Sequence, residues 1–435
     1  MTPESSPEDT RSATTVTSNT STPDFPAGFL WGASTAPHQN EGNNTTSDFW
    51  ALEQLPGSVF SERSGDALDL YHRWKEDVDL VKSLGLTAFR FGIEWARVEP
   101  TRGQFARAEL AHYRRIIDYC LSLGVEPVIT LHHFTSPLWF AQAGGWASDE
   151  AVDRFGDYVA AVAPILDGVT WVATINEPNM FAVMFQMSTP LQYPDPATVM
   201  AQINESMAPV NGDAGINAFT MPEPESIPTQ VMIAAHARAR AILREKTSVK
   251  VGWTIAVQGL VARPGFESEL ARYQWVWEDV FLEASKDDDW VGVQSYTSQL
   301  VGPNGLEGAP EGAELTQTGW AYRPDALGLA LRHTWKATGG TPMIVTENGI
   351  ATADDQQRID YTTGALEGLA AVLRDGLDVR GYLHWTLMDN FEWVHGYEKT
   401  FGLIAVDRTT FARTPKPSAH WLGNIARTNG STIRS

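Results

Sequence analysis

Two glutamates in this sequence each follow an apolar run and each lie beside an asparagine. Glu177 comes after the run in TWVATINEPNM, which spans residues 170–180, and Glu347 lies in IVTENGI. A carboxylate at the end of a buried strand is costly unless it is paired or has a chemical task. Two opposed carboxyl groups are what glycoside hydrolysis requires, because one protonates the leaving oxygen while the other attacks or activates water. For either glutamate alone, a structural acid in an ion pair is the alternative.

The two glutamates belong to a series of apolar runs that we predict to be strands. Most of the runs are nearly continuous in apolar residues, as expected of parallel strands covered on both faces. Amphipathic segments such as 67–85, 110–124 and 229–247 lie between them and predict helices. The predicted strands are 28–34, 86–93, 125–133, 169–175, 249–257, 290–296, 342–347 and 379–385.

This alternation predicts an α/β fold, a single-domain (β/α)8 TIM barrel. A doubly wound sheet is the rival, but no glycine-rich dinucleotide turn follows the first strand. We expect the barrel domain to span 25–428, between a disordered polar N-terminal tail at 1–24 and a C-terminal tail at 429–435. The segment 187–228 shows no period, so we expect an irregular loop over the active-site mouth.

Catalytic groups of such a barrel lie at the carboxyl ends of its strands. Glu177 follows the fourth strand and Glu347 the seventh, so in a ring of eight they can face each other across the mouth. The residues at or near the predicted strand ends form a mainly polar set: Arg90, His132, His133, Asn176, Glu177, Tyr296, Glu347, Asn348 and Trp385. Such a set suits a polar site better than a core.

Longer blocks of the sequence resemble the signature motifs of glycoside hydrolase family 1. The blocks are FLWGASTAPHQNEG, EDVDLVKSLGLTAFRFGIEWARVEP, TLHHFTSPLWF, TINEPN, IVTENG and GYLHWTLMDNFEWVHGYEKTFGLIAVD. They occur in the family's order between Phe25 and Ile425, with a weaker likeness through 187–228. The family comprises retaining β-glycosidases on a TIM barrel, so the resemblance implies this fold and this reaction.

The resemblance implies a role for each matching residue. Glu177 corresponds to the general acid/base and Glu347 to the nucleophile. Arg90 and Tyr296 correspond to groups that contact the nucleophile, where a cation favours the ionised carboxylate and a hydroxyl orients it. The implied substrate-binding residues are Gln39 and His133 for sugar hydroxyls, Asn176 for the 2-hydroxyl, Trp385 under the sugar ring, Glu392 and Trp393 for the outer hydroxyls, and Tyr296.

Some positions depart from the family pattern. Phe134 stands where tryptophan is usual, and it lacks an indole N–H, so glucose, galactose, fucose and mannose all stay open as the glycone. Gln294 and Ser295 replace the usual Asn-Tyr pair, and the longer amide can reposition the network around Tyr296. Glu392 is retained, whereas family branches that cleave 6-phosphoglycosides replace it. We therefore expect a non-phosphorylated sugar.

The composition argues against several other kinds of protein. Lys and Arg number 32 against 53 Asp and Glu, and the formal net charge of −21 disfavours nucleic acid and anionic membranes as partners. No apolar run approaches the roughly 18–20 residues of a membrane span. The single Cys120 and the absence of a signal-like start favour a cytoplasmic protein. No metal-ligand spacing, Walker loop or GxSxG motif occurs, so we expect neither metal nor cofactor.

The resulting prediction is a β-glucosidase-like retaining β-glycosidase that hydrolyses small-molecule or oligosaccharide β-glycosides by double displacement. A transglycosidase that uses the same residues is one alternative. An inactive sugar-binding homologue is another, although both glutamates are present. The glycone, the aglycone and the oligomeric state stay open.

Overall fold

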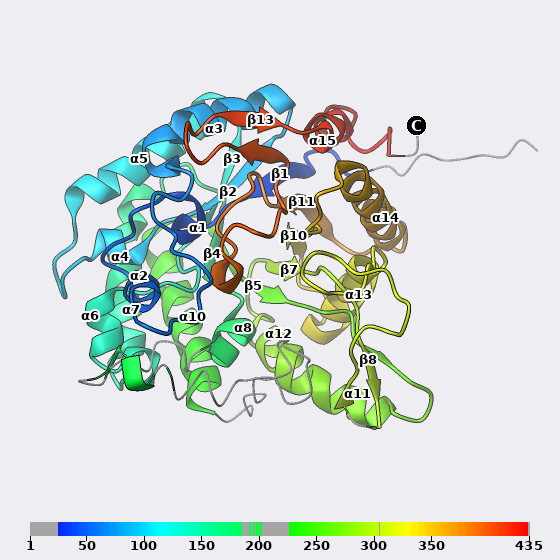
Figure 1. The fold of residues 1–435 in the computed structure, drawn as a ribbon, viewed down its shortest axis with the longest axis horizontal. Coiled ribbons are helices and arrows are strands. Elements are labelled where there is room, and N and C mark those ends of the chain that lie inside the picture. Colours follow the sequence, from blue (N-terminus) through cyan, green and yellow to red (C-terminus); the bar gives the residue numbers. More distant parts are fainter. Residues whose placement is uncertain are drawn as a thin grey trace, which may run out of the picture.

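A closed barrel of parallel strands forms the centre of the molecule (Figure 1). The computed structural model describes residues 25–184, 191–192, 195, 197–199, 201, 226–303 and 305–433. The barrel order is β1-β11-β10-β7-β5-β4-β3-β2, and all the predicted strands are confirmed. Their bounds are β1 Leu30–Ser34, β2 Ala88–Gly92, β3 Glu126–Thr130, β4 Trp171–Asn176, β5 Lys250–Ala256, β7 Val291–Gln294, β10 Met343–Glu347 and β11 Val379–Trp385. The predicted TIM barrel is therefore confirmed.

Helices surround the barrel on its outside (Figure 1). The longer ones are α3 Leu70–Leu84, α5 Arg107–Ser122, α7 Ala151–Val162, α10 Ile227–Lys246, α13 Ala326–Thr338, α14 Asp355–Arg374 and α15 Pro417–Arg427. The shorter ones are α1 Pro37–Asn40, α2 Asp48–Glu53, α4 Trp95–Val98, α6 Leu138–Gln142, α8 Pro178–Met184, α11 Glu267–Gln274 and α12 Val280–Ala284. Single turns are η1 Gly145–Ala147, η2 Ala163–Ile165, η5 Trp275–Asp279 and η6 Trp393–His395.

The helices form because their apolar residues recur at helical spacing. In α5 the buried face includes Tyr113, Ile116, Ile117 and Cys120, three or four residues apart. The α3 helix ends where Gly85 takes a positive φ of 91° and donates its N–H to the last carbonyls. These apolar helix faces pack against the outside of the strands, and together they form the larger part of the hydrophobic core.

A separate apolar cluster fills the inside of the barrel. It comprises Ala88, Val128, Trp171, Ala173, Trp290, Ile344 and Leu383. Most of these residues lie in the first half of their strands or, for Trp290, just before one. The carboxyl ends of the strands are thus left free for polar side chains, which is the edge where TIM-barrel enzymes carry their sites.

Two small sheets extend the loops. One pairs β12 Ile404–Val406 with β13 Arg413–Pro415, and the other joins β6 Val261–Ala262, β8 Leu300–Gly302 and β9 Gly305–Leu306.

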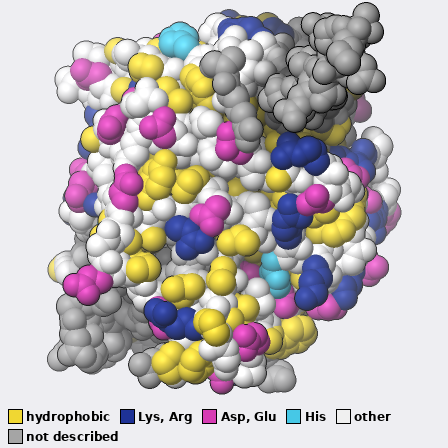
Figure 2. Space-filling model, turned by 90° about the vertical axis from the view of Figure 1, so that its right-hand side faces the viewer, with side chains coloured by type: hydrophobic (Ala, Val, Ile, Leu, Met, Phe, Trp, Pro, Cys, Tyr) yellow, Lys and Arg dark blue, Asp and Glu magenta, His cyan; other side chains and the backbone are white. Residues whose placement is uncertain are grey.

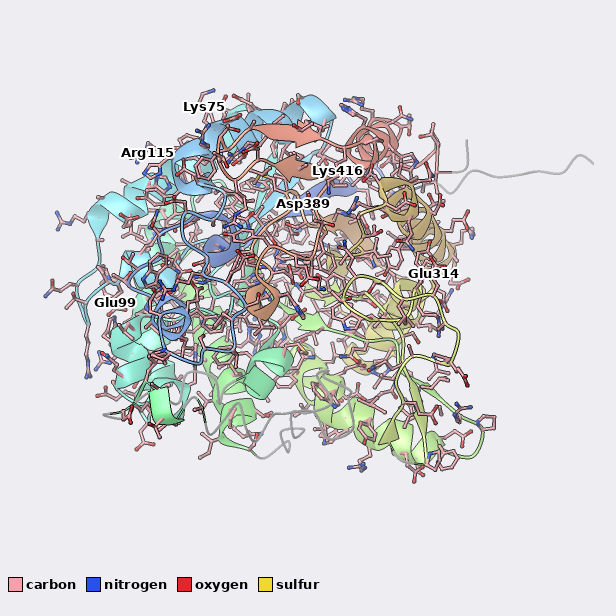
Figure 3. All side chains as sticks on the ribbon, viewed as in Figure 1. Lys75, Glu99, Arg115, Glu314, Asp389 and Lys416 are labelled. Atoms are coloured by element: carbon pink, nitrogen blue, oxygen red, sulfur yellow. The ribbon has the colours of Figure 1, made fainter. Side chains whose placement is uncertain are left out.

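The segment that follows β11 is anchored by Asp389, which accepts from the Gly402 N–H at 2.8 Å and pairs with Lys416 at 2.8 Å (Figure 3). This anchor holds the stretch that carries Glu392.

Residues 429–433, which we expect from the sequence to form a C-terminal tail, pack against the barrel domain. The Asn429 side chain accepts a hydrogen bond from the Trp31 indole at 3.0 Å and donates to the Phe25 carbonyl at 2.8 Å. Ile433 is buried. The predicted tail at 1–24 and most of the predicted loop at 187–228 lie outside the described residues.

Among the described residues, no helix is long and apolar enough to cross a membrane. On the face shown in Figure 2, acidic and basic side chains are interspersed with hydrophobic ones.

Candidate active site

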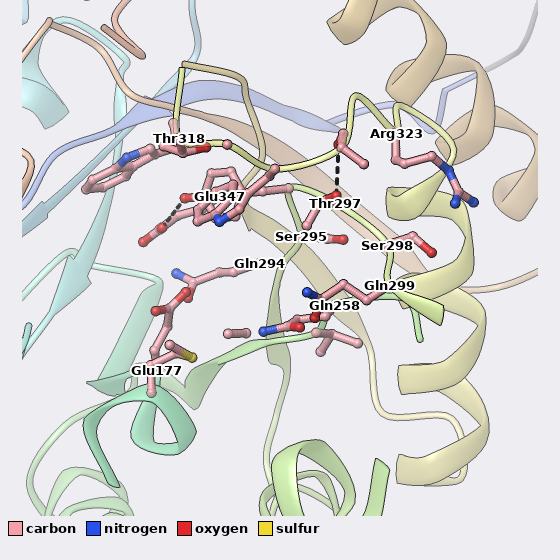
Figure 4. A pocket seen from close by; sticks show the side chains of 18 of the residues that line it. Glu177, Gln258, Gln294, Ser295, Thr297, Ser298, Gln299, Thr318, Arg323 and Glu347 are labelled. Carbon is pink, nitrogen blue, oxygen red and sulfur yellow. Dashed lines mark hydrogen bonds between the residues drawn. The ribbon is translucent and has the colours of Figure 1, made fainter. Parts of the chain in front are cut away.

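A cavity of about 460 Å³ opens at the carboxyl ends of the barrel strands. Glu177, Glu347 and Glu392 all line it, so three carboxyl groups share one space. In Figure 4, Glu177 and Glu347 approach this space from opposite sides. Glu177 directly follows β4 and Glu347 ends β10, so these two glutamates lie at the ends of different strands, as predicted from the sequence.

Glu347, the last residue of β10, is held by two donors. The Arg90 Nη1 atom donates to its Oε1 at 2.6 Å, and the Tyr296 hydroxyl donates to its Oε2 at 2.5 Å. Arg90 is fully buried and Glu347 is only 4% exposed. Burial raises the pKa of Glu347, while the Arg90 charge and the Tyr296 hydrogen bond oppose that rise. These two partners favour the ionised carboxylate.

Glu177 follows β4 in different surroundings. Among the described residues, no side-chain or backbone group donates a hydrogen bond to its carboxyl group. Burial, and then the charge of Glu347, raise the pKa of Glu177 well above its ordinary value. Its φ of 42° is unusual for a residue other than glycine, and such strained positions cluster at functional sites. The protonated acid is therefore favoured here.

The contrast between the two carboxyl groups sets their possible chemistry. A carboxyl group whose pKa is raised can donate a proton near neutral pH, and a neighbour paired with a cation can act as an anion. Since both lie in one cavity, this pair can perform acid and nucleophile or base chemistry on one molecule.

Asn176, which precedes Glu177, is tied into the same network. The Arg90 Nη2 atom donates to Asn176 Oδ1 at 2.6 Å, so one guanidinium holds both Asn176 and Glu347. Asn176 Nδ2 lies 3.2 Å from His133 Nε2. Burial, and then the Arg90 charge, lower the pKa of His133 well below its ordinary value, so this imidazole is neutral and accepts from the amide.

The remaining predicted binding residues gather on one side of the cavity. His133, Trp385 and Trp393 line it, and the rings of His133 and Trp385 stack with centroids 5.8 Å apart. Burial, and then the charge of Glu347, raise the pKa of Glu392 to about 8. Gln39 lies behind Glu392, fully buried, and its Nε2 donates to the Phe391 carbonyl at 2.9 Å.

Most, but not all, of the predicted residues at the strand ends face the cavity. His132 points away, packs against Trp146 and lies 3.0 Å from the Ser136 hydroxyl. Asn348 donates to the Ser295 carbonyl at 2.6 Å, beneath the cavity wall. These two residues therefore support the site from behind.

The structure also adds residues that the sequence reasoning did not assign. Thr254 donates to Asn176 Oδ1 at 2.9 Å, and Thr130 accepts from Arg90 Nε at 3.0 Å. Trp277 of η5 is buried and also lines the cavity. The spacing of Thr254 and Thr130 along the chain carries no signal, because each contact forms only when strands from different parts of the sequence meet.

No set of three or more His, Cys, Asp or Glu side chains within the described part of the chain is arranged to hold a metal ion. The polar groups that line the cavity are amides, carboxyls, hydroxyls, the imidazoles of His133 and His395 and the guanidinium of Arg323, and aromatic rings lie beside them. Such groups bind hydroxyl-rich molecules directly.

Comparison with known proteins gives a consistent result. The sequence pattern of Glycosyl hydrolase family 1 matches residues 21–264 and 281–431. Beta-glucosidase A from Thermotoga maritima is 30% identical, over 93% of this chain and 98% of that protein. A beta-glucosidase from Agrobacterium sp. is 31% identical, over 94% of this chain and 96% of that protein. The crystal structure of beta-glycosidase BGL167 has a TM-score of 0.82 and 42% identity, over 93% of this chain and 97% of that one.

Proposed function

This chain belongs to glycosyl hydrolase family 1 and is an O-glycosyl hydrolase, and from this premise we propose that it is a retaining β-glycosidase of the β-glucosidase type. Glu347 is the proposed nucleophile and Glu177 the proposed acid/base. One observation carries this assignment: Glu347 is bound by Arg90 and Tyr296, whereas the Glu177 carboxyl group has no donor among the described residues.

In the first step, an oxygen of Glu347 attacks the anomeric carbon from the face opposite the leaving group. The bond between this carbon and the leaving oxygen breaks, and Glu177 transfers its proton to that oxygen. The products are a glycosyl ester of Glu347 and a free alcohol or phenol. Arg90 and Tyr296 hold the attacking carboxylate in position, while Asn176 is placed to bind the 2-hydroxyl.

In the second step, water replaces the leaving group. Esterification removes the charge of Glu347, which was one cause of the raised pKa of Glu177, so Glu177 now acts as a base. Glu177 takes a proton from water, the water oxygen bonds to the anomeric carbon, and the ester bond breaks. Two inversions at one carbon give net retention of configuration.

We also propose that the glycone is not phosphorylated. A phosphate in this cavity would share it with three carboxyl groups. The Arg90 guanidinium already binds Glu347 and Asn176, and Arg323, the one Lys or Arg among the described lining residues, is paired with Asp325. Bringing a dianion into such a space without a free cation is costly. The Glu392 carboxyl suits two neighbouring hydroxyls instead. A reducing, cytoplasmic location is part of the proposal and is supported by the buried free Cys120.

A panel of 4-nitrophenyl β-glycosides, covering glucose, galactose, fucose and mannose, tests the proposal. We expect release of nitrophenol from at least one sugar, and a loss of about 10⁴-fold or more in Glu347→Gln. Glu367→Gln, on helix α14 outside the cavity, is a matched control. Proton NMR of the first product then reads the stereochemistry. A β anomer is expected. Formation of the α anomer first, or silence across the panel, would overturn the proposal.

A further inference from the structure

Gln294 ends strand β7 beside the proposed nucleophile, and its side chain meets Asn176. Its backbone pairs with Glu347 of β10 on one side and with Ala256 of β5 on the other. Gln294 is 1% exposed, and its side-chain Nε2 donates to Asn176 Oδ1 at 2.9 Å. Figure 4 shows it extending from β7 into the region between Glu177 and Glu347.

The orientation of both amides follows from their partners. Arg90 can only donate, so the Asn176 atom that faces it must be the oxygen Oδ1. The Gln294 atom that faces Oδ1 must then be the donor Nε2. Thr254 adds a third hydrogen bond to Oδ1 at 2.9 Å. Turning the Asn176 amide over would oppose its NH₂ group to these donors, so Nδ2 stays directed toward His133 and the cavity.

The other end of the Gln294 amide has no protein partner. Gln294 Oε1 is buried, and within the described residues nothing donates a hydrogen bond to it. Gln294 also lines the cavity. A buried carbonyl without a donor is costly, and such a group at a binding site is satisfied by a ligand that brings the donor.

We propose that Gln294 is a specificity-determining residue for this reaction, which fixes the Asn176 amide and accepts a hydrogen bond from the same 2-hydroxyl that Asn176 binds. The two amides meet through Nε2 and Oδ1, and both residues line the cavity, so the proposed hydroxyl lies between their other ends, Oε1 and Nδ2. A hydroxyl there can accept from Nδ2 and donate to Oε1, using both of its hydrogen-bonding modes. This inference rests on the proposed function, because Asn176 is assigned to the 2-hydroxyl there.

The test compares 4-nitrophenyl β-glucoside with its 2-deoxy analogue in the wild-type protein and in Gln294→Met. Methionine keeps the approximate length of glutamine but removes the donor and the acceptor. We expect kcat/KM for the glucoside to fall by about 10–100-fold and that for the 2-deoxy analogue by less than about threefold. Gln294→Asn keeps the polarity of the site but shortens the side chain by one methylene, which withdraws Oε1 from the hydroxyl, so it gives the same pattern if Gln294→Met does not fold. Gln142→Met, on an exposed turn of α6, is the matched control.

Each outcome is decisive. A larger loss for the 2-hydroxyl substrate supports the inference. An equal loss for both substrates overturns it. The equal loss can also come with an alkaline limb of the pH profile that moves to lower pH. In that case the substitution has lowered the pKa of Glu177, and Oε1 accepts a hydrogen bond from the protonated form of Glu177 instead of from the 2-hydroxyl. Failure of the wild-type protein to cleave any β-glycoside would instead count against the proposed function, and the two failures are thus distinguishable.

Discussion

The Tyr296 hydroxyl donates to Oε2 of Glu347 at 2.5 Å, and this contact acts directly on the charge state of the proposed nucleophile. The hydrogen bond lowers the pKa of Glu347 against the effect of burial. Glu347 must be ionised to attack, so activity is lost as the pH falls through its pKa. The acid limb of the pH profile therefore reports this contact.

We expect Tyr296→Phe to move the acid limb of kcat/KM to higher pH. Without the hydroxyl donor the pKa of Glu347 rises, because one hydrogen bond to its charged form is lost. A fall in kcat of about 10–100-fold should accompany it. Tyr322→Phe, outside the cavity, should leave the profile unchanged. An acid limb that stays in place would show that the hydroxyl does not tune the nucleophile.

Glu177→Gln should separate substrates by their leaving groups. A 2,4-dinitrophenol departs without a proton, whereas an alkyl alcohol or a sugar needs one. The glutamine variant keeps the shape of the side chain but cannot transfer a proton. We expect the rate of the glycosylation step to fall by about 10²–10⁴-fold for alkyl glycosides and by far less for dinitrophenyl glycosides. Single-turnover kinetics measures this step, and an equal loss for both kinds of substrate would contradict the role.

The sequence was sufficient to predict the barrel and the two glutamates. The strands are apolar runs of ordinary length, and each glutamate directly follows one, so local pattern and strand order determine where both lie. The resemblance also predicts that Arg90 and Tyr296 contact the nucleophile. The structure adds the hydrogen bonds from both residues to Glu347.

The contacts around Asn176 could not be predicted in the same way. Thr254 and Gln294 lie 78 and 118 positions away along the chain, and they meet Asn176 only because β4, β5 and β7 end at one edge. The packing of residues 429–433 could not be predicted for the same reason, because it depends on contacts between distant parts of the chain. Asn429 contacts Trp31 across 398 positions, and a polar C-terminal stretch carries no local sign of such a partner.

Arg413 and Asp77 provide a test of stability away from the cavity. Arg413 Nε lies 2.8 Å from Asp77 Oδ1, and both side chains are almost fully buried. Arg413→Met would leave the Asp77 carboxylate buried without its cation, which should lower the free energy of unfolding by about 3–5 kcal/mol. Urea denaturation measures this loss. Arg332→Met, which breaks an exposed pair with Asp375, should cost less than about 1 kcal/mol. Equal effects would mean that the buried pair contributes little.

Phe134 offers a test of the glycone. Its ring lines the cavity next to His133 and packs edge-on against Trp393, with centroids 5.3 Å apart. Phenylalanine presents no donor there, so a sugar hydroxyl on this side loses a hydrogen bond that tryptophan would make. We expect Phe134→Trp to raise kcat/KM for the preferred glycoside by about 3–30-fold, the range for one added hydrogen bond.

Monodeoxy glycosides identify the hydroxyl concerned. The gain in Phe134→Trp should disappear for the one analogue that lacks the contacted hydroxyl and persist for the others. Phe134→Leu, which removes the ring and adds no donor, controls for packing against Trp393 and should lower activity on all the analogues alike. A gain in the tryptophan variant that is the same for every analogue would mean that ring size, and not the missing N–H, shapes this wall. Galactose differs from glucose at C4, mannose differs from it at C2, and D-fucose is galactose without the 6-hydroxyl. The pattern of gains therefore also helps to name the glycone that this cavity holds.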